Sequence, residues 1–173
     1  MITQYFSRLF SALLVIVLSV VLTASLGYQL ITGQNPCPLC FLQRVAMIGV
    51  GIGQLLNFRF GIQIRHHAIS LFHCIFGFAV SLRQICLHIC PEFDAFGTPV
   101  LGFSLYTWAF IVFICAFVAI GVLMWLYDPK QKPLHSKPLD YLEKFASIYL
   151  LLIILDNIVT TAMVCGWICP ENP

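Results

Sequence analysis

The sequence predicts an all-α membrane protein, a bundle of about five transmembrane helices, and both its composition and its apolar stretches lead to this fold class. Of its 173 residues, 60% are hydrophobic and only 9% are charged. A soluble domain normally carries about 25% charged residues, so lipid must be the solvent for most of this surface. Five apolar stretches approach the roughly 20 residues needed to cross a bilayer. The basic residues are scattered singly, and no basic patch suggests binding to nucleic acid.

The predicted spans follow one another along the chain with short polar boundaries. The first starts after Arg8 and ends before a polar run at residues 32–35, and the second carries Arg44 in its first turn. The third and fifth contain the polar residues His73 and Asp156, and the fourth precedes a solvated connector with three lysines and three prolines. The chain, residues 1–173, is thus predicted to be a single integral-membrane domain with spans at about residues 9–31, 41–58, 68–85, 103–127 and 145–164.

The basic residues predict the side of the membrane on which each end of the chain lies. Cytoplasmic loops carry an excess of lysine and arginine. With a cytoplasmic N-terminus, seven of the nine basic residues fall inside, and only Arg44 and Arg83 lie toward the outer face. Five spans then put the C-terminus on the outer, periplasmic face. A cleaved signal peptide ending near Ala24 is the less favoured alternative, because the first apolar core is long and follows a single basic residue.

Six of the eight cysteines fall at the outer face in this topology, where disulfides persist. They form three close pairs in the sequence: Cys37 with Cys40, Cys86 with Cys90, and Cys165 with Cys169. The other two, Cys74 and Cys115, lie inside spans and are expected to be inert buried thiols. Among other polar residues, Asp156 is interpreted as a helix-packing residue, and His66 and His67 as part of a solvated inner loop.

The Cys37-Pro-Leu-Cys40 motif lies where an outer loop enters the second helix. Two cysteines separated by two residues close a small ring, and a helix N-terminus stabilises a thiolate over a thiol. Such a pair can alternate between dithiol and disulfide without a large backbone movement. Two alternatives remain open at this point: a permanent structural disulfide, or half of a zinc site completed by Cys165 and Cys169.

Arg44 follows Cys40 by four residues and therefore lies on the same helical face, one turn deeper. A charged side chain so near the hydrocarbon is costly and usually has a partner or a ligand. A guanidinium there is suited to hold a polar oxygen of a lipid-soluble electron acceptor. The alternative is an arginine whose charged end reaches back to the lipid headgroups.

The residues Cys37-Pro-Leu-Cys40-Phe-Leu-Gln-Arg44 resemble the CxxCxxxR signature of the DsbB-type disulfide-forming membrane proteins, and the resemblance in layout covers roughly residues 8–127. It implies a multi-pass protein of the bacterial inner (cytoplasmic) membrane. It also implies an oxidoreductase that reoxidises a soluble, thioredoxin-like thiol oxidase of the DsbA type and passes the electrons to membrane quinone. The quinone would be ubiquinone or menaquinone, and no metal is expected.

The same resemblance implies site residues. Cys37 and Cys40 take the place of the quinone-side pair, and Arg44 that of the quinone-contacting arginine. The family's second pair lies in the second outer loop, where Cys90 is the expected member and Cys86 its nominal partner. These two cysteines are only four residues apart, whereas the best-known members have widely separated ones. The tail residues Cys165 and Cys169 resemble the C-terminal pair of a five-span variety of the family, so they remain an alternative second pair.

His88 and two other functional interpretations complete the predictions. His88, near the outer end of the third span, is a candidate to hydrogen-bond a quinone oxygen, with a purely interfacial role as the alternative. A quinone reductase of the vitamin K epoxide reductase type is a second enzyme interpretation, although its CxxC pair normally lies late in the chain. The non-enzyme interpretation is a membrane protein with permanent disulfides or a zinc site.

Overall fold

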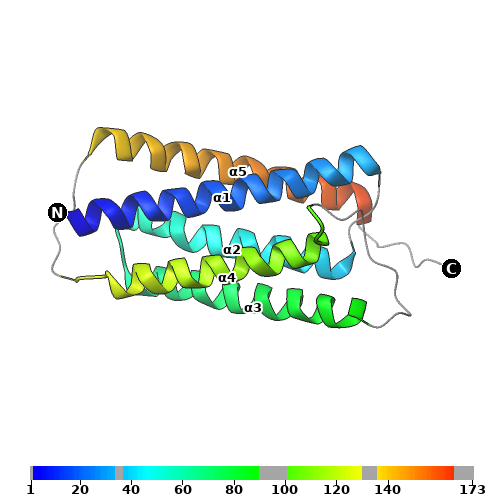
Figure 1. The fold of residues 1–173 in the computed structure, drawn as a ribbon. Coiled ribbons are helices and arrows are strands. Elements are labelled where there is room, and N and C mark those ends of the chain that lie inside the picture. The colour runs from blue at the N-terminus through cyan, green and yellow to red at the C-terminus, as the bar shows by residue number, and fades with distance from the viewer. Residues whose placement is uncertain (1, 34–36, 90–100, 130–135, 166–173) are drawn as a thin grey trace.

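The computed structural model describes residues 2–33, 37–89, 101–129 and 136–165, and this part of the chain is helical with short connections. The helices are, in chain order, α1 (Ile2–Thr32), α2 (Pro38–Phe60), α3 (Ile64–Ile89), α4 (Leu105–Trp125) and α5 (Lys137–Cys165). Each is long and apolar enough to cross a membrane. The predicted all-α bundle of five spans is therefore confirmed (Figure 1).

Most of the helices extend beyond the spans that hydropathy predicts. The third begins at Ile64 rather than residue 68 and ends at Ile89 rather than residue 85, and the fifth begins at Lys137 rather than residue 145. An apolar window detects only the part of a helix that lies in hydrocarbon, whereas backbone hydrogen bonding continues into the polar interface. His73 and Asp156 do not interrupt their helices.

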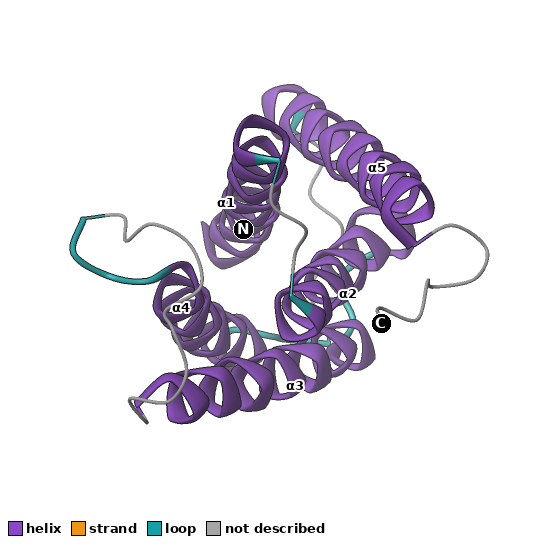
Figure 2. Ribbon diagram, turned by 90° about the vertical axis from the view of Figure 1, so that its right-hand side faces the viewer, coloured by secondary structure: helices purple, strands orange, loops and turns teal. Residues whose placement is uncertain are grey.

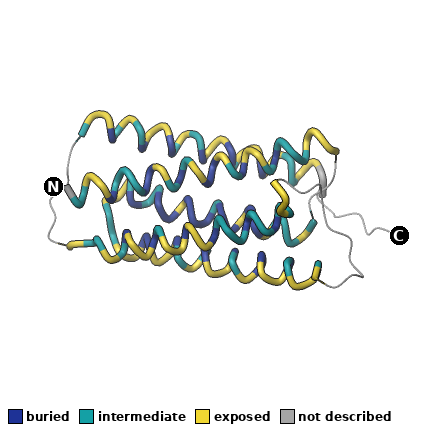
Figure 3. The backbone as a smooth tube through the Cα atoms, viewed as in Figure 1, coloured by how far each residue is buried: buried dark blue, intermediate teal, exposed yellow. Residues whose placement is uncertain are grey.

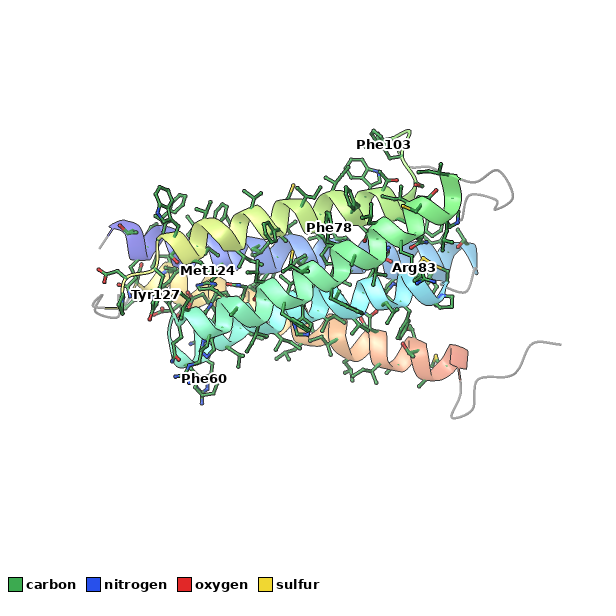
Figure 4. The ribbon with its side chains drawn as sticks, turned by 90° about the horizontal axis from the view of Figure 1, so that it is seen from below. Phe60, Phe78, Arg83, Phe103, Met124 and Tyr127 are labelled. Carbon is green, nitrogen blue, oxygen red and sulfur yellow. A yellow bond between two sulfur atoms is a disulfide. The ribbon has the colours of Figure 1, made fainter. Side chains whose placement is uncertain are left out.

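The helices run alternately in opposite directions, so the bundle has two distinct ends (Figure 1). The first, which we name the disulfide end, contains the ends of α1, α3 and α5 and the starts of α2 and α4. The second, the opposite end, contains the starts of α1, α3 and α5. Arg83 lies toward the disulfide end, whereas Phe60 and Tyr127 lie at the opposite end (Figure 4).

Helix α2 lies at the centre of the bundle, with α1 and α5 on one side and α3 and α4 on the other (Figure 2). It contacts each of the other four helices, whereas α5 contacts only α1 and α2 among the described helices. Small residues allow this central position: a methyl group on Gly53 would lie 2.8 Å from the carbonyl oxygen of His66, and one on Gly49 would overlap the His73 ring. Close approach through small residues is typical of helix packing in membranes.

The interior and exterior of the bundle are both largely apolar. Buried positions recur along each helix and alternate with exposed ones (Figure 3). The largest fully buried apolar side chains include Phe113, Leu18, Leu22 and Leu150. Many large apolar side chains, such as Phe72 and those of the outer face of α5, are exposed. This surface has hydrocarbon as its solvent, as the composition predicts.

An ion cluster joins α1 to α5 at the opposite end. Arg8 donates through Nε and Nη2 to both carboxylate oxygens of Glu143, at 2.7 and 2.6 Å, and through Nη2 to Asp140 at 2.7 Å. The paired bonds to Glu143 match the planar geometry of a guanidinium. Helix α5, which has few partners, is thereby fixed to the bundle near its start.

The interpretation of His66 and His67 as a solvated loop is wrong. Both lie in the first turn of α3 and are buried together with Gln54, Asn57 and Ser70. The Nε2 amide of Gln54 donates to Ser70 Oγ at 2.9 Å, and Asn57 Oδ1 accepts from the Gln63 backbone N–H at 3.0 Å. Mutual hydrogen bonds compensate the burial of these polar groups, which a hydropathy profile cannot register.

Two further expectations fail on helical geometry. Cys74 is buried as predicted, but Cys115 is exposed because α4 lies at the edge of the bundle. Asp156 is exposed on α5, whereas its neighbour Asn157 is buried and donates to the Ile153 carbonyl oxygen at 2.8 Å. Consecutive residues of a helix point about 100° apart, so only one of the two can face the bundle.

Candidate active site at the first turn of α2

A disulfide joins Cys37 and Cys40 at the start of α2, with the two Cα atoms 5.1 Å apart. Cys37 is the N-cap residue, with an extended backbone (φ −65°, ψ 154°), and its Sγ accepts a hydrogen bond from the Cys40 N–H at 3.1 Å. Pro38 occupies the first helical position, where its missing N–H costs nothing. The sulfurs therefore lie at the positive end of the helix dipole, which favours a thiolate.

Arg44 lies one turn deeper and is almost completely buried, with 7% of its surface exposed. Its guanidinium connects α2 to α1: Nε donates to Ser25 Oγ at 2.9 Å, Nη2 to the Ser25 carbonyl oxygen at 3.0 Å, and Nη1 to Gln29 Oε1 at 2.7 Å. All three acceptors are uncharged. The positive charge of Arg44 is thus fixed in position without being neutralised by these partners.

A cavity of about 340 Å³ lies between α1, α2 and α4 beside these residues. Cys40 and Arg44 both line it, together with Gln29, Tyr106 and Trp108 among others. Its remaining walls are mostly apolar side chains, including Leu22, Met47 and Val112. This combination of apolar walls, three aromatic rings (Tyr28, Tyr106 and Trp108) and a few fixed polar groups is typical of small-molecule sites, which usually have volumes of about 300–1,000 Å³.

His88 lies at the edge of this region rather than among the residues that line the cavity in the described part of the chain. Its ring stacks on that of Tyr106, with centroids 4.7 Å apart and planes inclined by 27°. Its Nδ1 lies 2.8 Å from the carbonyl oxygen of Gln84, which can only accept, so Nδ1–H is the donor and Nε2 is not engaged in this bond. The ring therefore borders the cavity through Tyr106.

Helix α3 brings a polar residue to the disulfide that was not predicted from the sequence. Gln84 is 1% exposed, and its Nε2 lies 3.3 Å from Cys37 Sγ and 3.4 Å from Cys40 Sγ. Gln43, also buried, donates from its own Nε2 to Gln84 Oε1 at 2.9 Å. The signal that was available is a glutamine inside a predicted span, because uncompensated polar groups are costly there.

The second cysteine pair is only partly visible. Cys86 lies on α3 with an exposed side chain and forms no disulfide with another described cysteine, and Cys165 is the last residue of α5. Cys90 and Cys169 lie outside the described residues, so the structure does not test the pairing of Cys86 with Cys90 or of Cys165 with Cys169. Among the described residues, no group of three or more histidine, cysteine or acidic side chains is arranged to hold a metal ion.

Comparison with known proteins agrees with this site. The model of the family "Disulfide bond formation protein DsbB" matches residues 7–95, just over half of the chain, including the disulfide and Arg44. Disulfide bond formation protein B 1 of Pseudomonas fluorescens strain Pf-5 is 25% identical over 146 residues, which is 65% of this chain and 86% of that protein. Its namesake from strain Pf0-1 is 24% identical over 149 residues, or 67% of this chain and 88% of that protein. No solved structure matches significantly.

With five spans, a cysteine pair at the start of the second and this match, the chain belongs to the DsbB family of disulfide bond formation proteins and is a multi-pass protein of the bacterial inner membrane.

Proposed function

We propose that this protein is a quinone-dependent protein-disulfide oxidoreductase. It reoxidises a soluble, thioredoxin-like thiol oxidase of the DsbA type and passes the electrons to membrane quinone, either ubiquinone or menaquinone. The observation that carries this proposal is that Cys40 of the disulfide and the guanidinium of Arg44 line one cavity between membrane-spanning helices. A cavity at this depth favours an apolar, lipid-soluble acceptor over a nucleotide cofactor.

The residues around the cavity fit a quinone ring. Tyr106 and Trp108 offer aromatic surfaces, and Arg44 offers a fixed positive charge whose three bonded partners are neutral. When bound, a quinone supplies the two-electron acceptor that the cysteine pair needs. Arg44 then stabilises negative charge on the acceptor side, and Cys40 presents the sulfur at the cavity wall.

The electrons enter through a second cysteine pair on the periplasmic side. A thiolate of the soluble oxidase attacks the second disulfide, and exchange through mixed disulfides transfers the electron pair to Cys37 and Cys40. We assign Cys90 to this step with Cys86 as its partner; Cys165 with Cys169, or Cys90 with a tail cysteine, are the alternatives. This assignment rests on a cytoplasmic N-terminus, which puts the disulfide end of the bundle outside.

Substitution of Cys40 tests the proposal, with Cys115→Ser as the matched control because Cys115 is an exposed thiol in α4. In membranes supplied with the reduced client and quinone, Cys40→Ser is expected to abolish quinone reduction, whereas Cys115→Ser is expected to behave as wild type. The Cys37–Cys40 bond of the wild type should also become reduced when quinone is withdrawn. Near-normal quinone reduction by Cys40→Ser, or a bond that stays oxidised without quinone, would refute the proposal.

Mass spectrometry of the oxidised protein, digested without reduction, identifies the second pair. A peptide that links Cys86 to Cys90 is the expected result. A Cys165–Cys169 peptide found together with a free Cys90 thiol would transfer the client-facing step to the tail.

We assign to His88 a hydrogen bond from the edge of the cavity to a quinone oxygen. His88→Phe keeps an aromatic ring beside Tyr106 and removes the ring nitrogens. The KM for quinone is therefore expected to rise in His88→Phe while the KM for the client stays constant. An unchanged quinone KM would leave His88 with a stacking role only.

A further inference from the structure

The disulfide has a hydrogen-bond donor that comes from a different helix and a distant part of the chain. The Gln84 Nε2 atom on α3 lies within 3.4 Å of both sulfurs on α2, at 3.3 Å from Cys37 Sγ and 3.4 Å from Cys40 Sγ. A carboxamide nitrogen carries two hydrogens, so one Gln84 side chain can donate to both sulfurs. Only 1% of the surface of Gln84 is exposed, so its side chain has almost no contact with solvent.

Gln43 fixes which edge of the Gln84 carboxamide faces the sulfurs. Its Nε2 donates to Gln84 Oε1 at 2.9 Å, and Gln43 itself is 5% exposed. Because Gln84 Oε1 is the acceptor in that bond, the opposite edge, Nε2, is the one directed at the cysteines. Rotation of the Gln84 carboxamide alone by 180° would place two nitrogens against each other and the Gln84 oxygen against the sulfurs. The pair of glutamines is therefore oriented for donation.

The Arg44 guanidinium does not provide this donation. Its three hydrogen bonds are to Ser25 and Gln29 on α1. The donors at the sulfurs are instead the Cys40 N–H, which is bonded to Cys37 Sγ, and the amide of Gln84. Gln84 therefore donates to the sulfurs, whereas the guanidinium of Arg44 is bonded to α1.

A disulfide sulfur is a weak acceptor, whereas a thiolate is charged and accepts much stronger hydrogen bonds. Both cysteines are half-buried, so water can solvate a thiolate there only in part, and a charge that lacks partners costs more than a disulfide. A buried donor placed here therefore stabilises the opened pair more than the closed one. It favours release of a thiolate and makes the pair a stronger oxidant.

We propose that Gln84 is a catalytic residue of the exchange reaction and that Gln43 is its positioning residue. When an incoming thiolate attacks Cys37 Sγ, a new S–S bond to Cys37 forms and the Cys37–Cys40 bond breaks. Cys40 leaves with the electron pair as a thiolate, and no proton is transferred in this step. The Gln84 N–H stabilises the charge that appears on Cys40 Sγ. This inference rests on the proposed function, because it assumes that the pair opens in each turnover.

The test compares Gln84→Met with a matched control, Gln54→Met, in the full-length protein. Methionine has nearly the volume of glutamine and donates no hydrogen bond, and Gln54 is an equally buried glutamine of α2 bonded to Ser70 near the opposite end. The reduced proteins, in detergent and without client or quinone, are alkylated over a range of pH, and the peptide that contains Cys37 and Cys40 is quantified by mass spectrometry. In Gln84→Met the dependence of alkylation on pH is expected to shift to higher pH by about one unit, which is a tenfold loss of thiolate at a given pH. Gln54→Met is expected to match the wild type.

The equilibrium with glutathione gives a second measurement on the same samples. Gln84→Met is expected to shift it about tenfold toward the disulfide, equivalent to about 30 mV for this two-electron couple. Gln84→Glu is a second variant for the case that methionine impairs folding. It keeps the side-chain shape and places an acid beside the sulfurs, so it is expected to shift the pH profile in the same direction. Gln43→Leu should give a smaller shift, because the Gln84 donor remains but is free to rotate.

A pH profile and an equilibrium that coincide with wild type in Gln84→Met and Gln84→Glu would overturn the proposal. Neither measurement uses quinone or the client, so this failure differs from failure of the proposed function. A pair that does not respond to quinone would refute the function even if Gln84 controls thiolate formation.

Discussion

Removal of the Arg44 charge gives the sharpest kinetic test of the cavity. Arg44→Gln keeps a polar side chain but loses the positive charge, and each hydrogen bond from a charged donor contributes about 1.5–3 kcal/mol. If one such bond to the reduced acceptor is lost, kcat/KM for quinone should fall by about 10- to 150-fold, at about 1.4 kcal/mol per factor of ten. The value of kcat/KM for the client should stay within about twofold, because the client reacts at another disulfide.

The assay follows quinone absorbance in detergent while the concentration of one substrate is varied at a time. Ser25→Ala is the matched control, since it removes one acceptor of Arg44, 2.9 Å from Nε, and leaves the Ser25 carbonyl and Gln29 to hold the guanidinium. A decrease of less than about threefold is expected for this variant, since one neutral acceptor is lost. If Arg44→Gln retains wild-type kcat/KM for quinone, or loses the same factor for both substrates, the guanidinium does not act on the acceptor.

The remaining predictions concern the scaffold. Glu143→Gln should lower the free energy of unfolding in detergent by about 1–3 kcal/mol, because it removes the charge that pairs with Arg8 of α1. Asp140→Asn should lower it less, because Asp140 is more exposed, and equal effects of the two variants would contradict this account. Gly53→Ala should impair packing of α2 on α3 and lower the unfolding temperature, whereas Gly27→Ala, which has open space for a methyl group, should not. An impermeant thiol reagent should reach a cysteine introduced at the exposed Ile64 only from the cytoplasmic side. It should reach the reduced Cys37 and Cys40 only from the periplasm. Labelling of both sites from one side would overturn the cytoplasmic placement of the N-terminus.

Local spacing was sufficient to predict the parts of the site that lie on one helix. The positions of Cys37, Cys40 and Arg44 follow from a helix that starts beside Pro38, because residues four apart share a face. The number of spans also followed, since hydropathy measures the solvent of a helix directly. These features depend on sequence neighbours alone.

The partners supplied by other helices could not be predicted in the same way. Gln84 meets Cys40 only because α3 packs on α2 in one register, which depends on the close contacts at Gly49 and Gly53. The burial of His66 and His67 likewise depends on polar partners that α2 provides at the same depth. A hydropathy profile averages such polar residues with their apolar neighbours, so it shows only a lower mean hydropathy for the span and not the polar contacts.

The position of the disulfide on α2 has a consequence for the energy needed to change its redox state. Its two sulfurs belong to the N-cap and the third residue of α2, a helix that contacts all four other helices. The first turn is also closed by a backbone hydrogen bond, from the Phe41 N–H to the Cys37 carbonyl oxygen at 3.0 Å, which does not involve either sulfur. Breaking the S–S bond therefore requires side-chain rotation but no unwinding of the backbone. A small reorganisation energy is therefore expected for the couple, and the described helices are expected to keep their arrangement when the pair opens. A molecule in the bilayer that distinguishes the reduced from the oxidised protein is then expected to respond to the charge on the sulfurs rather than to a change in the shape of the bundle.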